Sequence, residues 1–421
     1  MAVSGQPRAP VSALLELDEA RRLVLGATGL LGSEDVELDD ALGRALAEDV
    51  VAREPVPAFD SSAMDGFAAR AEDLAGASGG SPVVLSVVDE SRAGAPADTT
   101  LMPGQAIAIS TGAMLPAGAD TIVRLEDAVG AEDRVEVLVA PAPGHDVRRA
   151  GDDIGAGDTV LRRGVEIGPA ALGVLASLGR ESVPCSRRPR VSLLTSGDEL
   201  IAPGAGSRAG AVRDSNRFTI SALARRAGAE LVRCATVADD AERTVAALAL
   251  AVEDVDVAVI CGGVSVGVHD HVRPALRALG AQQELWGIAL KPGRPTWFGT
   301  IGETLVFGLP GNPVSAMVTF VLLVRPALRV LAGLAPLLPR ATAVLAHDYA
   351  KPPGRAHAVR CRVSEREDGW HAEACGPQGS HVLTSMLGAD ALAMIPTACD
   401  GVRAGERVEI EWLGNGAGAV A

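Results

Sequence analysis

The stretch DVDVAVICGGVSVGVHD, residues 254–270, decides the fold of this chain. From Val255 to Cys261 it is a nearly unbroken apolar run, which is typical of a strand covered on both faces. Two glycine-bearing turns follow, and glycines let backbone amides approach a ligand closely because no Cβ intervenes. A carboxylate such as Asp270 at the end of this loop suits a metal or a phosphate-bearing substrate. The alternative is a turn whose glycines serve chain reversal alone.

Strands and helices alternate on both sides of this stretch, which predicts a doubly wound parallel sheet. Three of its strands, at 190–195, 255–261 and 304–308, are followed by the loops TSGDEL, GGVSVGVHD and GLPGNPVS. Loops at the carboxyl ends of parallel strands share one edge of the sheet and form the ligand crevice. We therefore expect Asp198, Glu199 and Asp270 to lie there together. Mg²⁺ typically bridges one or two such carboxylates to substrate phosphates.

Other nucleotide and metal motifs are absent from the sequence. The chain has neither a Walker A loop nor a GxGxxG fingerprint. His269 and His271 stand two residues apart with no third ligand in view, so the sequence does not favour a zinc site.

A compact anion site is expected around Lys291 and Arg294, which flank Pro292-Gly293 in the apolar context IALKPGRPTWFG. Farther along, Asn312 fits a helix N-cap, Pro313 the first helical position and Ser315 the first turn. A helix N-terminus that offers amides and a hydroxyl favours a tetrahedral anion. Ordinary surface charge is the alternative reading of the two cations.

Composition limits the class of protein. The 421 residues allow roughly three domains, and 38 basic against 53 acidic residues argue against a nucleic-acid-binding surface. Six cysteines without a CxxC pair fit reduced thiols rather than a disulfide or zinc framework. No leader and no uninterrupted apolar run of about 18 residues are found. We therefore expect a cytoplasmic protein that does not bind membranes.

The regions on either side of the predicted sheet have different sequence patterns. Residues 11–25 predict an amphipathic helix with Ser12 as a candidate N-cap. Short alternating segments between 81 and 140 predict a small β domain, and those after 341 predict a compact β barrel. Between the helix and the small β domain lies PVPAFDSSAMDGFA, residues 55–68, in which Asp60 and Asp65 stand in a loop-like context. On its own this segment is equally well a proline-ordered linker.

The segment PxFDSSAMDGFAxR resembles the signature loop of the molybdopterin molybdenumtransferases, the MoeA and gephyrin E-domain family. Companion motifs follow in the order that the family has: STGA at 110–113, GDDI at 151–154, TSGDEL, GGVSVGVHD, KPGRP and GLPGNPVS. The resemblance covers essentially the whole chain. It implies insertion of molybdate into adenylylated molybdopterin with release of AMP, assisted by Mg²⁺.

The resemblance also implies roles for individual residues. Catalytic roles fall on Asp65, Thr111, Asp153, Glu199 and Asp270, and metal ligation on Asp198, Glu199 and Asp270. Substrate or molybdate binding falls on Gly262, Gly263, Ser265, Gly267, Lys291, Arg294, Pro310, Pro313, Ser315, Arg355, Arg360 and Ser380. The family usually has Lys at position 294, where Arg keeps the charge.

The predicted architecture is an α/β multidomain chain. It comprises an elongated N-terminal domain (11–56 and 146–186), an inserted small β domain (57–145), a doubly wound molybdopterin-binding domain (187–336) and a C-terminal β barrel (337–421). The family further implies a homodimer with composite sites, in which Asp65 of one chain serves a site near Asp270 of the other. A molybdopterin adenylyltransferase is a candidate partner. Rival functions are molybdopterin adenylylation itself and a non-catalytic molybdopterin-binding scaffold.

Overall fold

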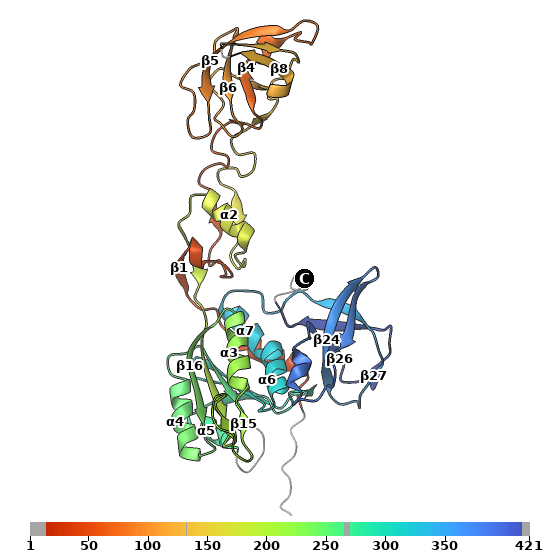
Figure 1. Cartoon of the computed structure of the whole chain (residues 1–421). Coiled ribbons are helices and arrows are strands. Elements are labelled where there is room, and N and C mark those ends of the chain that lie inside the picture. Colours follow the sequence, from red (N-terminus) through yellow and green to blue (C-terminus); the bar gives the residue numbers. More distant parts are fainter. Residues whose placement is uncertain (1–13, 132, 265–269, 415–421) are drawn as a thin grey trace, which may run out of the picture. The chain divides into compact units, whose positions relative to one another are not determined.

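A computed structural model describes residues 14–131, 133–264 and 270–414 of the chain. The chain divides into two compact units (Figure 1). The first contains the residues up to Asp35, residues 43–47 and everything from Pro184 onward, and the second contains Val36–Leu42 and Glu48–Val183. The four predicted domain boundaries are finer than this division and stay predictions.

A six-stranded sheet forms the centre of the first unit, in the order β16-β13-β17-β21-β20-β18. Its strands are β13 (Arg190–Ser196), β16 (Glu230–Val237), β17 (Val257–Cys261), β18 (Gln282–Trp286), β20 (Trp297–Ile301) and β21 (Thr304–Leu309). The first four strands in that order run parallel. Every residue of β17 is buried, as expected for an apolar run covered on both faces.

Two strands at one edge of this sheet were not predicted. β20 pairs with β21 antiparallel, and β18 pairs with β20 antiparallel. The reversal follows from a two-residue turn, Gly302-Glu303, in which Gly302 has a φ of +58°. The doubly wound sheet is therefore confirmed, with a mixed edge in place of a wholly parallel one.

Helices cover both faces of the sheet, because alternate residues of each buried strand point to opposite sides. Val257 and Val259 pack among α1 (Leu17–Gly26), α3 (Asn216–Arg226), α6 (Pro313–Thr319) and α7 (Arg325–Leu331). Ala258 and Ile260 pack against α4 (Ala241–Ala251) and α5 (Val272–Ala278). A π-helical segment, Phe320–Val324, joins α6 to α7.

The first helix begins later than the sequence indicates. Leu15 is still extended, since its N–H donates to Gly287 O (3.3 Å) and its carbonyl accepts from Ala289 N (2.7 Å). The helix starts at Leu17 with Glu16 at the N-cap position. The predicted cap Ser12 lies outside the described residues.

One helix is apolar on average without being the uninterrupted apolar run that was not found in the sequence. Among the described helices, Pro313–Leu331 is long and apolar enough to cross a membrane by length and composition. Ser315, Thr319 and Arg325 interrupt the apolar run in the sequence, yet the mean hydropathy of the segment stays high. Since 78% of the apolar window is buried inside the structure, the helix serves as a core helix.

A closed barrel follows the sheet, with its strands drawn in blue in Figure 1. The order β24-β25-β22-β28-β26 returns from β26 to β24. The strands are β22 (Ala341–Leu345), β24 (Ala356–Arg366), β25 (Gly369–Ala374), β26 (Ala391–Ile395) and β28 (Arg407–Trp412). β19 (Leu290–Lys291) adds to β24, and β23 (Tyr349–Ala350) pairs with β27 (Gly401–Val402). The predicted barrel is thereby confirmed.

The second unit contains a six-stranded sheet in the order β7-β4-β6-β5-β9-β8. Its strands are β4 (Gly66–Ala69), β5 (Val83–Ser91), β6 (Gln105–Ile109), β7 (Thr121–Arg124), β8 (Ala128–Ala131) and β9 (Arg134–Val137). The signature segment, read from sequence as a loop, partly forms strands: Gly66 begins β4, and a Cβ there would collide with the carbonyl oxygen of Val123. Glycine is therefore required at that position.

The rest of the second unit is built from short elements. Helix α2 spans Pro169–Ser177. β2 (Val50–Val51) pairs with β11 (Thr159–Leu161), and β3 (Ser61–Ser62) pairs with β10 (Val147–Arg148). Further short elements of the chain are β1 (Ser33–Glu37), β12 (Ser182–Ser186), β14 (Leu200–Ile201), β15 (Val212–Arg213), η1 (Leu38–Asp40), η2 (Ala71–Leu74), η3 (Leu125–Asp127) and η5 (Leu383–Met386).

Candidate functional site

The loops after β13, β17 and β21 meet at one edge of the first unit's sheet, as predicted, and border a cleft of about 620 Å³. We call it the strand-end cleft. Its lining includes Ser196, Gly197, Glu199, Arg213, Asp214, Asn216, Asp239, Gly262, Gly263, Asp270, Pro310, Gly311, Asn312, Pro313 and His381. The structure thus brings six predicted site residues together: Glu199, Gly262, Gly263, Asp270, Pro310 and Pro313.

Two glycines in this cleft are required by their positive φ angles and by atoms packed closely against them. Gly262 has a φ of +93°, and a Cβ there would lie 2.5 Å from the Ser196 carbonyl oxygen. Gly263 has a φ of +65°, and a Cβ there would lie 2.6 Å from Val272. Both positions exclude a side chain, so the backbone itself forms this wall of the cleft.

The acidic residues of the cleft are only partly those expected. Asp198 does not line the cleft, because its Oδ1 accepts from Asp239 N (3.0 Å). Asp239 lines it instead, and its two oxygens accept from Ser196 Oγ (3.0 Å) and Asp198 N (3.3 Å). Asp239 was missed although it closely follows β16. The strand-end rule that singled out Asp198 and Asp270 applies to it equally.

A second missed pair lies at the start of α3. Asp214 is buried, and its Oδ2 accepts from Thr195 Oγ1 (2.6 Å) while its Oδ1 accepts from Arg217 N (3.0 Å). The Asp214 side chain thus accepts a hydrogen bond from the first turn of α3, while Ser215 stands at the N-cap position. Asn216 Nδ2 donates to Gly311 O (2.7 Å), which ties the helix to the GLPGN loop. These residues hold the walls of the cleft together.

Residues at the N-terminus of α6 already make hydrogen bonds to another part of the protein. Asn312 stands at the N-cap position and Pro313 at the first helical position, as predicted. Asn312 does not cap through its side chain, since its Nδ2 donates to Ser380 Oγ (3.0 Å). The N–H of Val314 donates to the Ser380 carbonyl (3.2 Å). Ser315 is buried and does not line the cleft.

Arg360 holds the loop that carries Ser380. This arginine is 1% exposed. Its Nε donates to Ser385 Oγ (3.1 Å), and its Nη2 donates to the carbonyls of Pro377 (3.3 Å) and Gly379 (3.1 Å). We call residues 375–388 the barrel loop. One consequence is that His381, on this loop, reaches the strand-end cleft.

The cations predicted to bind an anion are not part of the cleft lining, although Pro295, next to Arg294, is. Lys291 is exposed and is paired in register with His357 across β19 and β24, and Arg294 is exposed nearby in sequence. Burial, then the charges of Lys291, Lys351 and Arg355, lowers the pKa of His357 to about 4. Lys291 and Arg355 therefore share one basic region at the junction of sheet and barrel.

The second unit brings two more predicted residues together. Asp65 Oδ1 accepts from Thr111 N (2.7 Å) and from Thr111 Oγ1 (3.0 Å). Asp153 is exposed elsewhere in this unit, and its N–H donates to the Val56 carbonyl (3.1 Å).

An ion pair also lies on this unit, between Asp60 Oδ2 and Arg149 Nη1 at 2.6 Å. The N–H of Ala150 and then the Arg149 side chain lower the pKa of Asp60. Asp60, the other aspartate of the signature segment, is thus held ionised by its neighbours.

Two predicted residues, Ser265 and Gly267, lie outside the described residues. Across the described ranges, no cluster of three or more His, Cys, Asp or Glu side chains is arranged to hold a metal ion. All six cysteines are unpaired, which agrees with the expectation of free thiols.

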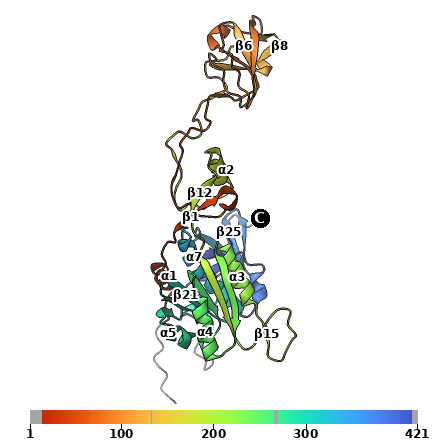
Figure 2. The same ribbon diagram turned by 90° about the vertical axis from the view of Figure 1, so that its left-hand side faces the viewer.

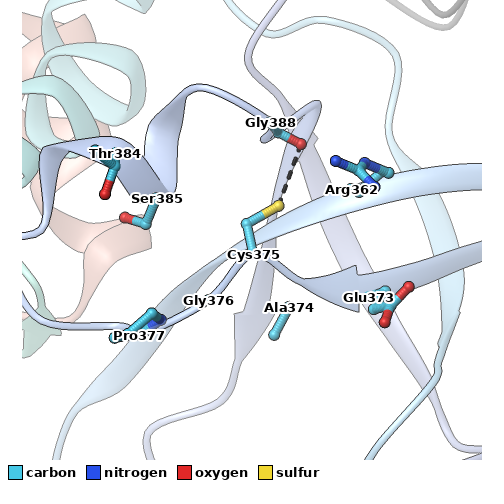
Figure 3. Close-up of a pocket in the computed structure, with 9 residues that line it drawn as sticks. All are labelled: Arg362, Glu373, Ala374, Cys375, Gly376, Pro377, Thr384, Ser385 and Gly388. Carbon is cyan, nitrogen blue, oxygen red and sulfur yellow. Dashed lines mark hydrogen bonds between the residues drawn. The ribbon is translucent and has the colours of Figure 1, made fainter.

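A separate cavity of about 350 Å³ lies in the barrel (Figure 3). Cys375 stands at its centre, with Arg362 and Glu373 to one side and Thr384 and Ser385 to the other. The Cys375 thiol donates to the Gly388 carbonyl (3.1 Å), and burial raises its pKa.

The fold and the cleft define a class before any comparison: an α/β protein with a cleft at the strand ends of a doubly wound sheet, the place where proteins of this class bind ligands. Family models sharpen this class. The MoeA N-terminal region (domains I and II) matches residues 15–179, a probable molybdopterin binding domain matches 192–330, and the MoeA C-terminal region (domain IV) matches 342–413.

Curated relatives and a solved structure match this chain along nearly its full length. Molybdopterin molybdenumtransferase 2 of Mycobacterium tuberculosis is 38% identical over 381 residues, covering 89% of this chain and 94% of the relative. The molybdopterin molybdenumtransferase of Haemophilus influenzae is 35% identical over 403 residues, covering 94% and 98%. The crystal structure of the molybdopterin biosynthesis moeA protein from Pyrococcus horikoshii superposes with a TM-score of 0.81, at 31% identity, covering 95% of this chain and all of that one. The chain belongs to the MoeA family, whose curated members here are enzymes of molybdenum cofactor biosynthesis.

Proposed function

We propose that this chain is a molybdopterin molybdenumtransferase that inserts molybdate into adenylylated molybdopterin and releases AMP. The observation that carries the proposal is the strand-end cleft, whose lining, apart from His381, lies in the part of the chain that matches a molybdopterin binding domain. It combines glycine backbone at Gly262 and Gly263 with the carboxylates Glu199, Asp239 and Asp270. Backbone amides suit the phosphates of such a substrate, and carboxylates suit a hard cation.

Mg²⁺ fits the residues of this cleft. Glu199 and Asp270 both line it, and Mg²⁺ is usually held by one or two carboxylates together with substrate phosphates rather than by a cage of protein ligands. The lack of a three-ligand cluster among the described residues agrees with that mode. When bound, the ion would neutralise charge on the phosphates. Asp198 is the weakest of the proposed ligands, since Asp239 N occupies its Oδ1.

For molybdate we propose the basic region at the junction of sheet and barrel. Lys291 and Arg355 both act on His357 there, and an oxyanion would reduce their mutual repulsion. Arg294, Ser315, Arg360 and Ser380 are the further candidates. Arg360 already donates to three acceptors, so its contribution would be to hold the barrel loop unless binding rearranges it.

We further propose a homodimer whose sites are composite. Asp65, Thr111 and Asp153 lie in the second unit, whereas Glu199 and Asp270 lie in the first. In a two-fold assembly each chain can present the same surface to its partner reciprocally. Asp65 of one chain would then serve the substrate held near Asp270 of the other. A cytoplasmic location and a molybdopterin adenylyltransferase partner are parts of the same proposal.

The direct test supplies purified protein with adenylylated molybdopterin, molybdate and Mg²⁺. AMP is quantified by chromatography, and the molybdenum cofactor by reconstitution of a cofactor-free molybdoenzyme. We expect both products in equal amounts. Asp270→Asn should keep the fold and lose the Mg²⁺-dependent rate, because an amide removes the charge that a hard cation needs. Unchanged Mg²⁺ dependence in this variant would remove Asp270 from the site, and absence of both products from the wild type would contradict the function.

The composite site is tested by mixing two inactive proteins, Asp65→Ala and Asp270→Ala. Exchange of subunits should regenerate one intact site per heterodimer and restore part of the activity. Heterodimers that form, as seen by mass spectrometry under native conditions, and stay inactive would show that each site is built within one chain.

A further inference from the structure

The charge of the strand-end cleft does not match the ligand proposed for it. Among the described residues that line it are four carboxylates: Glu199, Asp214, Asp239 and Asp270. The predicted cations Lys291 and Arg294 are not part of the lining. A phosphate ester placed among these carboxylates would be repelled unless cations offset them. A divalent ion supplies part of this charge, and the protein must supply the rest.

Two side chains in the described lining can carry a positive charge, Arg213 and His381. They come from different parts of the fold. Arg213 belongs to β15 (Val212–Arg213), which pairs with β14 (Leu200–Ile201) directly after the TSGDEL loop. Figure 2 shows this excursion, labelled β15, extending from the sheet. His381 belongs to the barrel loop.

Each side chain keeps donors available at the cleft. Arg213 is exposed, and with the described residues it makes one side-chain hydrogen bond, from Nη1 to Ala205 O at 3.2 Å. A guanidinium carries five N–H donors in a rigid fork, so most of them remain for a ligand.

His381 combines a fixed backbone with an exposed ring. Its neighbour Ser380 is held by Asn312 Nδ2 and by Val314 N, and its own carbonyl accepts from Leu383 N (3.1 Å). Ordering this imidazole on a ligand therefore costs side-chain freedom only, not the ordering of a loop.

We infer that Arg213 and His381 are substrate-contact residues that bind a phosphate group of a nucleotide ester in the strand-end cleft. This inference rests on the proposed function, which supplies an adenylylated substrate, and it deepens that function by naming the protein's own phosphate donors. Neither residue was singled out by sequence. Arg213 lies in the segment VRDSN just before α3, and His381 follows the Gln-Gly-Ser segment of the barrel loop.

The test compares AMP with adenosine, which lacks the phosphate, by titration calorimetry of the full-length protein with Mg²⁺ present. Arg213→Gln and His381→Gln should each weaken AMP at least about tenfold, the scale of one charge-assisted hydrogen bond. Adenosine should change less than twofold. Matched controls are Arg225→Gln on α3 and His347→Gln in the barrel, which are exposed and do not line the cleft. They should leave the affinity for AMP unchanged.

Three outcomes would overturn the inference: equal losses for AMP and adenosine, which indicate a structural role; losses as large in the controls, which indicate net charge alone; or unchanged AMP affinity in both variants. The inference and the proposed function can fail separately. If Arg213 and His381 govern AMP binding but no molybdenum is inserted, the inference holds and the function fails. If insertion proceeds with an unaltered substrate KM in both variants, the function holds and the inference fails.

Discussion

His357 makes the barrel sensitive to acid, and the size of the effect follows from its surroundings. The residue is 3% exposed; its Nδ1 lies 3.1 Å from the Tyr349 hydroxyl, and its Nε2 is buried without a partner among the described residues. Burial first, and then the charges of Lys291, Lys351 and Arg355, lowers its pKa from 6.5 to about 4. The imidazole is therefore neutral in the folded protein at physiological pH.

The direction and the size of the change in stability with pH follow from the linkage between proton binding and folding. Between pH 6.5 and pH 4 the unfolded chain binds a proton at this residue and the folded chain does not, so stability falls as the pH is lowered through that window. One pKa unit corresponds to about 1.4 kcal/mol, so a shift of this size changes the free energy of unfolding by at most about 3.5 kcal/mol. Below pH 4 both states are protonated and the loss is complete.

The assay is hydrogen–deuterium exchange of peptides from β24 and β26 between pH 4.5 and pH 7.5, corrected for the intrinsic pH dependence of exchange. The free energy of opening should fall with decreasing pH in the wild type. In His357→Gln, which keeps a polar side chain but does not titrate, the profile should be flatter by up to about 1.4 kcal/mol per pH unit. Parallel profiles for the two proteins would refute the reasoning, because carboxylates elsewhere would then account for the whole acid sensitivity.

Three further predictions concern the site. Lys291→Ala should raise the molybdate concentration needed for half-maximal rate by about tenfold or more, the effect of losing one charge-assisted hydrogen bond. If high molybdate does not restore the rate, or if the molybdate concentration needed is unchanged, Lys291 does not bind the oxyanion. Arg360→Met should lower the free energy of unfolding in urea by about 2–3 kcal/mol, because it removes three hydrogen bonds made by a buried guanidinium and leaves the buried Ser385 hydroxyl without this donor. A loss below about 1 kcal/mol would show that the barrel loop is held by other contacts. Thr111→Val removes the hydroxyl bond to Asp65 but keeps the backbone N–H bond, so it should reduce turnover less than Asp65→Ala does, with Thr111→Ser restoring the wild-type rate.

Much of the fold could be predicted because its signals are local. The apolar run before Cys261 and the regular alternation of strands and helices indicated the doubly wound sheet, and short alternating segments indicated the barrel. The edge strands β18 and β20 were missed. Gln282–Trp286 begins with three polar residues that are all exposed, so it lacks the buried pattern that marked β17.

The candidate site was only partly predictable, for a different reason. The strand-end rule located Glu199 and Asp270 because their positions depend on topology alone. The orientation of Asp198 depends on a partner, Asp239, 41 residues away. The basic residues also depend on pairing distant in sequence, since β19 joins the barrel and carries Lys291 away from the cleft lining. No local pattern encodes such contacts.

The contact between Ser380 and α6 has a consequence for synthesis of the chain on the ribosome. Asn312 and Ser380 are 68 positions apart, and Ser380 emerges later. At the usual elongation rate of about 5–20 residues per second, roughly 3–14 s separate the two. During that interval the sheet can assemble while the first turn of α6 and the His381 wall of the cleft are still incomplete. The nascent sheet domain thus exists for several seconds as an open half-site, which the barrel closes only once it has been translated.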